Sequence, residues 1–291
     1  MSSQNIKPRQ RGLGWSVKKA VLFFRLSWHN RVAKLSIVNK ASNVTVSLTT
    51  HSTRINRVHA AIESIGLGRM KPARLILYLS KEFHGKPLPG ALKRLVRRGL
   101  EVKYCEDVGP HTKYYPYIRE TQTFHEPLVT ADDDKMYSPY WLESLHQAWL
   151  GFPHQINCFR ARVVGLDGEG FLPYANWPLC TNDSASFLHF ATGVSGVIYP
   201  PSYLVALKAS GEAFKEICPY GDDIWLHRVA LRNGFRVRQV QSESLEFPGV
   251  PLSSRTALHT TNIGLGRNDQ QILLSYEACD LATLRSEAVQ A

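Results

Sequence analysis

Three aspartates in a row, Asp132, Asp133 and Asp134, follow the apolar run PLVTA at residues 127–131. Adjacent carboxylates repel one another, and a hard cation relieves that repulsion, because Mg²⁺ and Mn²⁺ bind one or two carboxylates together with phosphate oxygens. If the strand continues through the run, alternate side chains share a face, so Asp132 and Asp134 would face one pocket and Asp133 would point elsewhere. The run predicts a metal site; an acidic loop, or a cap for a helix over 140–150, is the plainer interpretation.

A second acidic pair, Asp222 and Asp223, stands in the segment YGDDIWL at residues 220–226. Aspartate is favoured at the start of a helix, and the apolar spacing after the pair predicts a helix from this point. One aspartate suffices for such a cap. The second carboxylate is placed to act as a general base within a pocket.

The elements that must position these residues alternate along the first half of the chain. Predicted strands and helices follow one another as strand 44–48, helix 55–65, strand 74–79, helix 91–98, strand 101–105 and strand 127–131. This alternation predicts an α/β fold with a mostly parallel central sheet and helices on both faces. Ligands bind such sheets at the carboxyl ends of the strands, where the three aspartates would lie.

The second half of the chain is more mixed. We expect a long strand over 156–164, a helix over 222–232 and a last strand over 235–240. The helix over 222–232 would begin at the second acidic pair, so the two acidic elements sit at the ends of elements that a single sheet could bring together.

Positive charge is concentrated at the N-terminus. The 291 residues carry a net charge of +11, yet residues 1–40 hold nine Lys and Arg and no Asp or Glu. The remainder therefore has 26 basic and 24 acidic side chains and is nearly neutral. A nucleic-acid-binding domain usually carries its basic face on the domain itself, so no nucleic-acid partner is expected.

Within this leader, we expect residues 1–14 to form a disordered basic segment and residues 15–40 to form an amphipathic helix. Helical spacing places six apolar residues on one narrow stripe, with Lys18, Lys19, Arg25 and Lys34 off it. The stripe comprises Val17, Val21, Phe24, Trp28, Val32 and Leu35. Two interpretations stay open: residues 15–35 lie on an anionic membrane surface, or the stripe packs on the protein's own core.

The five cysteines are scattered and show no zinc or redox spacing. Their apolar or strand-like surroundings predict mostly buried free thiols, which favours a reducing compartment and hence the cytoplasm. These cysteines are Cys105, Cys158, Cys180, Cys218 and Cys279.

In order and context, five segments resemble those of bacterial GT-A glycosyltransferases of the family 2 type found in surface-polysaccharide and lipopolysaccharide synthesis. The resemblance spans roughly residues 44–275. Its segments are VSLTTHSTRINRVHAAIES (46–64), KPARLILYLS (71–80), VTADDDKMYSPYWLESL (129–145), TGVSGVIYPPSYL (192–204) and YGDDIWLHRVALRNG (220–234). It implies a GT-A, Rossmann-like domain over 41–275, followed by a C-terminal tail over 276–291.

The resemblance also implies roles for the acidic residues. Asp132 and Asp134 are the outer members of a DxD motif: Asp134 would bind Mn²⁺ or Mg²⁺ bridging the donor diphosphate, and Asp132 would contact the ribose or the metal. Asp133 counts with the donor-binding residues. Asp223 would be the general base that deprotonates the acceptor hydroxyl, and Asp222 would cap the helix or hold acceptor hydroxyls.

Other donor-binding positions follow from the same resemblance. Thr49, Thr50 and Arg54 lie where the end of the first strand would meet the nucleotide, and Lys113 would reach the diphosphate. Many family members have an aspartate after the second strand, whereas this chain has Ser-Lys-Glu at 80–82. The nucleobase therefore stays open.

The function implied is an inverting, metal-dependent transfer of a sugar from a nucleoside-diphosphate sugar to a hydroxyl of a glycan or glycolipid acceptor. The enzyme would be cytoplasmic, and peripheral at the inner face of the cytoplasmic membrane if the leader binds lipid. Two alternatives use the same residues: a metal-dependent hydrolase or nucleotidyltransferase, and a membrane-tethered, non-catalytic module that binds glycan or nucleotide.

Overall fold

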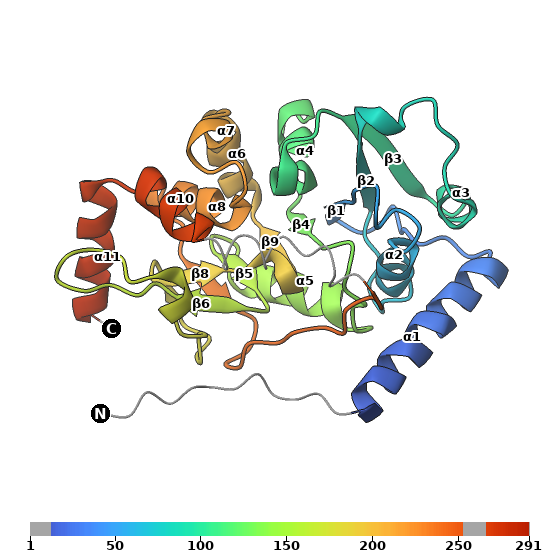
Figure 1. Cartoon of the computed structure of the whole chain (residues 1–291), viewed down its shortest axis with the longest axis horizontal. Coiled ribbons are helices and arrows are strands. Elements are labelled where there is room, and N and C mark those ends of the chain that lie inside the picture. The colour runs from blue at the N-terminus through green and yellow to red at the C-terminus, as the bar shows by residue number, and fades with distance from the viewer. Residues whose placement is uncertain (1–12, 253–265, 291) are drawn as a thin grey trace.

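The computed structural model describes residues 13–252 and 266–290. Its centre is an eight-stranded sheet in the order β3-β2-β1-β4-β9-β5-β10-β7 (Figure 1). The strands in that order are Leu100–Cys105, Arg74–Ser80, Thr45–Thr49, Leu128–Thr130, Val197–Tyr199, Ile156–Cys158, Val237–Gln239 and Ala185–Ser186. Strands β3, β2, β1 and β4 are mutually parallel, as are β5 and β10, whereas β9 and β7 run antiparallel to their neighbours.

Helices cover both faces of this sheet, as the alternating pattern predicts. Side chains alternate along β2, so that Leu75, Leu77 and Leu79 enter one hydrophobic cluster and Ile76 and Tyr78 the other. The first cluster includes α2 (His59–Gly66), α3 (Gly90–Val96) and α5 (Trp141–Gly151). The second includes α4 (Tyr115–Glu120), α6 (Pro201–Ala209), α7 (Phe214–Ile217) and α8 (Asp222–Arg232). The predicted α/β class is confirmed.

The predicted strand over 156–164 is wrong in its extent. It divides into β5, in the central sheet, and β6 (Ala161–Val163), which pairs with β8 (His189–Ala191) in a separate two-stranded sheet. Residues 156–164 have the composition of a strand throughout, although polar side chains at Asn157, Arg160 and Arg162 interrupt the apolar ones. Periodicity alone does not mark the change of sheet.

The N-terminal helix α1 (Leu13–Val32) ends earlier than the predicted residue 40 and lies along α2 and α3 (Figure 1). Beyond it the chain is held by Ile37, which is fully buried and donates its N–H to the carbonyl of Arg98. No helix in the described ranges is both long and apolar enough to cross a bilayer.

The C-terminal residues that the sequence sets apart as a tail form a helix, α11 (Ala278–Gln290), which follows α10 (Arg267–Ser275). Arg232 of α8 pairs with Asp280 at 2.7 Å, and Leu284 is fully buried. Helix α11 therefore packs on the body of the protein. Four of the cysteines are buried free thiols, as expected, and Cys279 is exposed.

Candidate active site

The three aspartates lie in a turn, not in a strand, because β4 ends at Thr130. The expectation that strand alternation pairs Asp132 with Asp134 therefore does not apply. Asp132 points to Lys113, whereas Asp133 and Asp134 share the guanidinium of Arg54. The Tyr137 hydroxyl, which accepts the Asp132 N–H at 2.8 Å, helps to fix the turn.

Asp133 ties this turn to the carboxyl end of β1. Its Oδ2 accepts a hydrogen bond from the Thr50 hydroxyl at 2.5 Å, and its Oδ1 accepts one from Arg54 Nη1 at 2.8 Å. The side chain is buried, so both of its oxygens find partners within the protein. Thr49 lies apart from this contact, because its hydroxyl donates to the carbonyl of Tyr78 on β2.

Lys113 joins the two acidic elements that are separated by about ninety residues of sequence. Its Nζ lies 3.1 Å from Asp132 Oδ1 and 3.0 Å from Asp222 Oδ2. Burial lowers the pKa of this ammonium, but the carboxylates of Asp132 and Asp222 outweigh burial and raise its pKa well above the ordinary value. Lys113 is therefore a permanently charged centre between two carboxylates.

The position of Lys113 is set by the 3₁₀ turn η2 (Gly109–Lys113). Its carbonyl accepts a hydrogen bond from Ser47 of β1. His111, in the same turn, is fully buried, stacks on Phe214 of α7 and contacts the Cys218 carbonyl through Nε2 at 2.9 Å. The turn is thus fixed both to the sheet and to the segment that leads into α8.

Asp222 and Asp223 lie in the first turn of α8. The N-cap residue is Gly221, and no side chain forms a capping hydrogen bond there. Of the two roles expected for Asp222, the helix cap is therefore wrong, because Gly221 occupies that position; a contact with acceptor hydroxyls stays a prediction. Its carboxylate pairs with Lys113 instead, and Asp223 Oδ1 accepts the backbone N–H of Gly193 at 3.0 Å. Both carboxylates are free of a capping role and face the cluster around Lys113.

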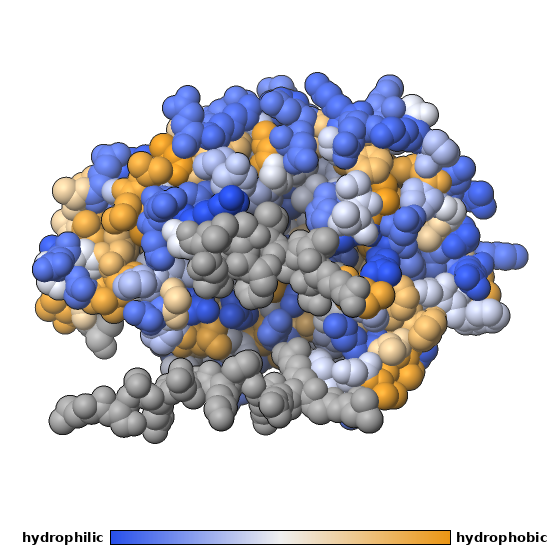
Figure 2. Space-filling view, in the orientation of Figure 1, coloured by the Kyte–Doolittle hydropathy of each residue, from blue (hydrophilic) through white to orange (hydrophobic). Residues whose placement is uncertain are grey.

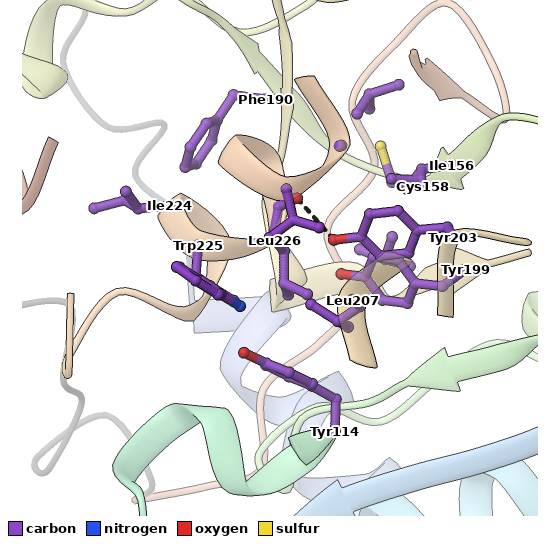
Figure 3. Packing of buried hydrophobic residues seen from close by; sticks show 14 of the residues in the cluster. Tyr114, Ile156, Cys158, Phe190, Tyr199, Tyr203, Leu207, Ile224, Trp225 and Leu226 are labelled. Atoms are coloured by element: carbon purple, nitrogen blue, oxygen red, sulfur yellow. Dashed lines mark hydrogen bonds between the residues drawn. The ribbon is translucent and has the colours of Figure 1, made fainter. Parts of the chain in front are cut away.

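Packing beneath α8 holds these two carboxylates in place. Figure 3 shows Trp225 and Leu226 of α8 lying against Tyr203 of α6 and Tyr114. The Tyr203 hydroxyl donates to the carbonyl of Leu226 at 2.7 Å. Because these rings are buried, a shift of the first turn of α8 would disturb a close-packed core.

The pKa values of the two adjacent carboxylates move in opposite directions. Burial, and then the negative charge of Asp222, raise the pKa of Asp223 to about 8. Burial also disfavours the charged form of Asp222, but the ammonium of Lys113 outweighs it and lowers the pKa of that carboxyl. A carboxyl with a pKa near the working pH is suited to accept and release a proton.

Asp134 is also perturbed: burial and the charge of Asp132 raise its pKa to about 6. In the described ranges, no three His, Cys, Asp or Glu side chains converge as a ready-made metal cage. Two carboxylates completed by phosphate oxygens are nevertheless a donor set that Mg²⁺ and Mn²⁺ accept. The residues fit a divalent cation that a phosphate ligand completes, and Asp132 and Asp134 would hold it.

Gly193 is a site residue that the sequence analysis quoted within a segment but did not single out. It opens the 3₁₀ turn η4 (Gly193–Ser195). A Cβ at this position would lie 3.2 Å from Asp223 Oδ1 and 3.2 Å from Lys113 Nζ, tighter than ordinary van der Waals contact. The glycine therefore lets backbone approach both charged groups.

A pocket is lined by residues of two segments, one before Lys113 in the chain and one before Asp222. Its volume is about 260 Å³. The walls combine carboxylates, an ammonium and aromatic rings, contributed by Glu106, Asp107, Gly109, Phe214, Lys215 and Tyr220.

No protein-family model matches the chain, and no curated protein matches its sequence. Solved structures do show a likeness. A 4-diphosphocytidyl-2C-methyl-D-erythritol synthase from Anaerococcus prevotii is 11% identical over 79% of this chain and 98% of that one, with a TM-score of 0.47. The mannosyltransferase PcManGT from Pyrobaculum calidifontis, in complex with GDP-Man and Mn²⁺, is 14% identical over 96% of this chain and 74% of that one, with a TM-score of 0.48.

A third likeness is to residues 1–349 of S. aureus TarS in complex with UDP. Its identity is 15%, its TM-score is 0.47, and the match covers 69% of this chain and 59% of that one. At these identities and TM-scores the likenesses assign no activity to the chain. The function must be argued from the site.

Proposed function

We propose that this protein is a glycosyltransferase that moves a sugar from a nucleoside-diphosphate sugar to a hydroxyl of a glycan or glycolipid acceptor, with inversion at the anomeric carbon. One observation carries the proposal. Lys113, a buried charged ammonium, lies between Asp132 of the aspartate turn and Asp222 of α8, with Asp223 beside it. This arrangement supports a site in which a cation suited to a diphosphate lies near a carboxyl suited to proton transfer.

Asp223 is the base in this proposal. Its carboxylate takes the proton of the acceptor hydroxyl as that oxygen attacks the anomeric carbon, and the bond from that carbon to the diphosphate oxygen breaks. The proton ends on Asp223 and the electron pair on the leaving nucleoside diphosphate. A single in-line displacement of this kind inverts the anomeric configuration and needs no covalent nucleophile.

Lys113 and Arg54 supply the charge that the leaving diphosphate needs. Both cations are already paired with carboxylates of the aspartate turn. An arriving phosphate would therefore replace one of these carboxylates as the partner of Lys113 or Arg54. Bound Mn²⁺ or Mg²⁺, held by Asp132 and Asp134, would add positive charge where the leaving group develops negative charge. Preorganised charge of this kind stabilises a transition state without reorganisation.

The pocket beside Lys113 suits the acceptor. Carboxylates such as Glu106 and Asp107 accept hydrogen bonds from sugar hydroxyls, and the rings of Phe214 and Tyr220 offer apolar faces for a pyranose. The pocket is lined by residues of the two segments that lead to Lys113 and to Asp222, and for that reason we place the acceptor there. A surface polysaccharide or lipopolysaccharide precursor in the cytoplasm is the acceptor class that we infer.

Two competing functions make different demands on the same residues. A nucleotidyltransferase commonly uses a glycine-rich loop to cradle phosphates, whereas residues 49–54 at the end of β1 contain no glycine. A hydrolase would release nucleoside diphosphate without any acceptor. A non-catalytic module would bind ligand but would not need a base with a raised pKa.

Calorimetry with UDP, GDP, CDP and dTDP tests the proposal, each with Mn²⁺ and each with EDTA. We expect one nucleotide to bind with Mn²⁺, and both EDTA and Asp134→Ala to abolish that binding. Asp183→Asn is the matched control, because Asp183 is an exposed aspartate paired with Arg238. Absence of binding to all four nucleotides would contradict the proposal. So would a turnover assay in which the corresponding nucleoside-diphosphate sugar is hydrolysed at the full rate without acceptor.

A further inference from the structure

Helix α1 presents a continuous apolar stripe to solvent. All six residues of the predicted stripe are at least half exposed, with exposed fractions between 52 and 78%. Figure 2 shows hydrophobic residues gathered at the lower right of the view, where α1 lies. The stripe comprises Val17, Val21, Phe24, Trp28 and Val32 in the helix and Leu35 just after it. The alternative in which this stripe packs on the protein's own core is therefore wrong.

The opposite face of the helix is the one that packs. Leu26 is buried, in a cluster with Met136 and Val250 that also includes Leu22 and Phe23. Asn30 is 1% exposed and donates to Glu63 Oε1 at 2.9 Å. Turning the stripe inward would break these contacts and leave the fully buried carboxylate of Glu63 without Asn30, so the stripe is fixed outward.

Positive charge flanks the exposed stripe. Lys18, Arg25, Arg31 and Lys34 are exposed, and none of them forms an ion pair with a carboxylate of the described residues. The first forty residues contain no acidic side chain. An apolar stripe bordered by cations matches the acyl boundary and the anionic headgroups of a lipid surface.

We propose that α1 lies flat on an anionic lipid bilayer, with its stripe inserted at the headgroup boundary and its flanking cations on the phosphates. A second copy of this chain is the less suitable occupant, because two identical faces would bring their unpaired cations together without a counter-charge. The inference does not depend on the proposed glycosyl transfer, since it concerns a surface that none of the proposed site residues shares.

Vesicle co-sedimentation of the full chain tests the proposal. We expect binding to vesicles of phosphatidylcholine mixed with phosphatidylglycerol and much weaker binding to vesicles of phosphatidylcholine alone. Phe24→Ser with Trp28→Ser should weaken binding by about tenfold to a few hundredfold, because two large side chains no longer leave water. Leu273→Ser with Leu274→Ser is the matched control, since both are exposed leucines on α10.

The charges are tested separately. Lys18→Gln with Arg25→Gln should weaken binding to the anionic vesicles by about tenfold or more and should leave residual binding less sensitive to salt. Thermal melts of all variants check folding, and the exposed positions predict unchanged melting temperatures. Equal binding to both vesicle types, unaltered binding of the Phe24/Trp28 variant, or a dimer in sedimentation equilibrium that this variant dissociates would overturn the proposal.

Discussion

Asp222 and Asp223 are neighbours in sequence with opposite electrostatic surroundings. Lys113 contacts the first carboxylate directly at 3.0 Å and keeps it ionised. The second carboxylate accepts a hydrogen bond from Gly193, and desolvation followed by the negative charge of Asp222 raises its pKa to about 8. Because Lys113 contacts only one of two identical side chains directly, Asp222 serves as its ion-pair partner and Asp223 is suited to accept a proton.

This division predicts a pH dependence. Asp223 accepts a proton only when ionised, and its pKa of about 8 means that it is protonated below that pH. Transfer activity should therefore rise with pH and level off above about 8, and Asp223→Asn should lower kcat by about 10²–10⁴. Rates measured across pH at saturating donor and acceptor provide the check.

The control is Asp222→Asn, which removes the neighbouring negative charge that helps to raise the pKa of Asp223. Its residual activity should reach half its plateau at a lower pH than the wild-type activity does. A pH profile that is the same in both proteins would show that Asp223 is not the titrating base.

Gly193 carries the second prediction at this scale. Gly193→Ala places a Cβ 3.2 Å from both Asp223 Oδ1 and Lys113 Nζ, so these groups must move by a few tenths of an ångström. We expect transfer activity to fall by about tenfold, because a small displacement of a catalytic group lowers the reaction rate. Gly151→Ala, in open space at the end of α5, should leave activity unchanged. Steady-state rates of the two variants decide the matter, and equal rates would contradict a positioning role for Gly193.

At the scale of elements, helix α1 shows which part of a pattern a sequence can predict. The 3.6-residue spacing predicts a helix here, and the helix exists. The spacing also marks an apolar stripe, but the helix packs through Leu26 and Asn30 on the other side. The buried Glu63 of α2, which pairs with Arg98 and binds Asn30, selects that side, and a long-range polar contact leaves no trace in local periodicity.

Replacement by alanine should therefore be much more destabilising on the packed face of α1 than on its exposed face. Asn30→Ala removes hydrogen bonds to Glu63 Oε1 and the Ala91 carbonyl and should lower the free energy of unfolding by about 1–3 kcal/mol. Trp28→Ala, at 65% exposure, should change it by less than about 0.5 kcal/mol. Denaturant titrations measure both, and a larger loss at Trp28 than at Asn30 would refute this account of how α1 packs.

The aspartate turn shows the same division between local and distant information. An apolar run followed by three aspartates predicts a strand end with acidic residues, and β4 does end there. The orientation of each carboxylate depends on Arg54, Thr50 and Lys113, which arrive from β1's end and η2. Their contacts are set by the order of strands in the sheet, which local alternation does not report.

At the scale of the whole molecule, each terminal helix is held to the body of the protein by a buried polar group: α1 by Glu63 of α2, and α11 through Asp280, which pairs with Arg232 of α8. Asn30 and Arg98 meet the buried Glu63 at the N-terminal end, and Arg232 meets the buried Asp280 at the C-terminal end. The charge and composition of the leader set the N-terminal segment apart, and the resemblance sets the C-terminal one apart, but neither reports which buried partner a segment finds.

We therefore expect α1, α11 and β2 to open together. Amide hydrogen exchange in the middle of each helix should be protected to a degree close to that of the β2 amides, because detaching either helix breaks a buried polar contact and exposes a buried leucine, Leu26 or Leu284. Exchange in α1 or α11 that is faster than in β2 by several orders of magnitude would show that the helix detaches on its own.

The sheet class follows from the alternation of strands and helices in the first half, whereas the insertion of β9 between β4 and β5 does not. Strand β9 pairs with both neighbours through residues 197–199. Its short run is hydrophobic on both faces, which predicts a buried strand but not its place or direction. Strand order is a property of the folded sheet as a whole.

The place of β9 also has a consequence for biosynthesis. During translation β1, β2, β3 and β4 emerge first, and β4 cannot complete its second edge until residues 197–199 have left the ribosome. At roughly 5–20 residues per second the open edge persists for some seconds, and open edges invite pairing between nascent chains. A polypeptide that stops before residue 197 would contain β1 to β4 and the three aspartates, but the edge of β4 that pairs with β9 would stay open to other chains.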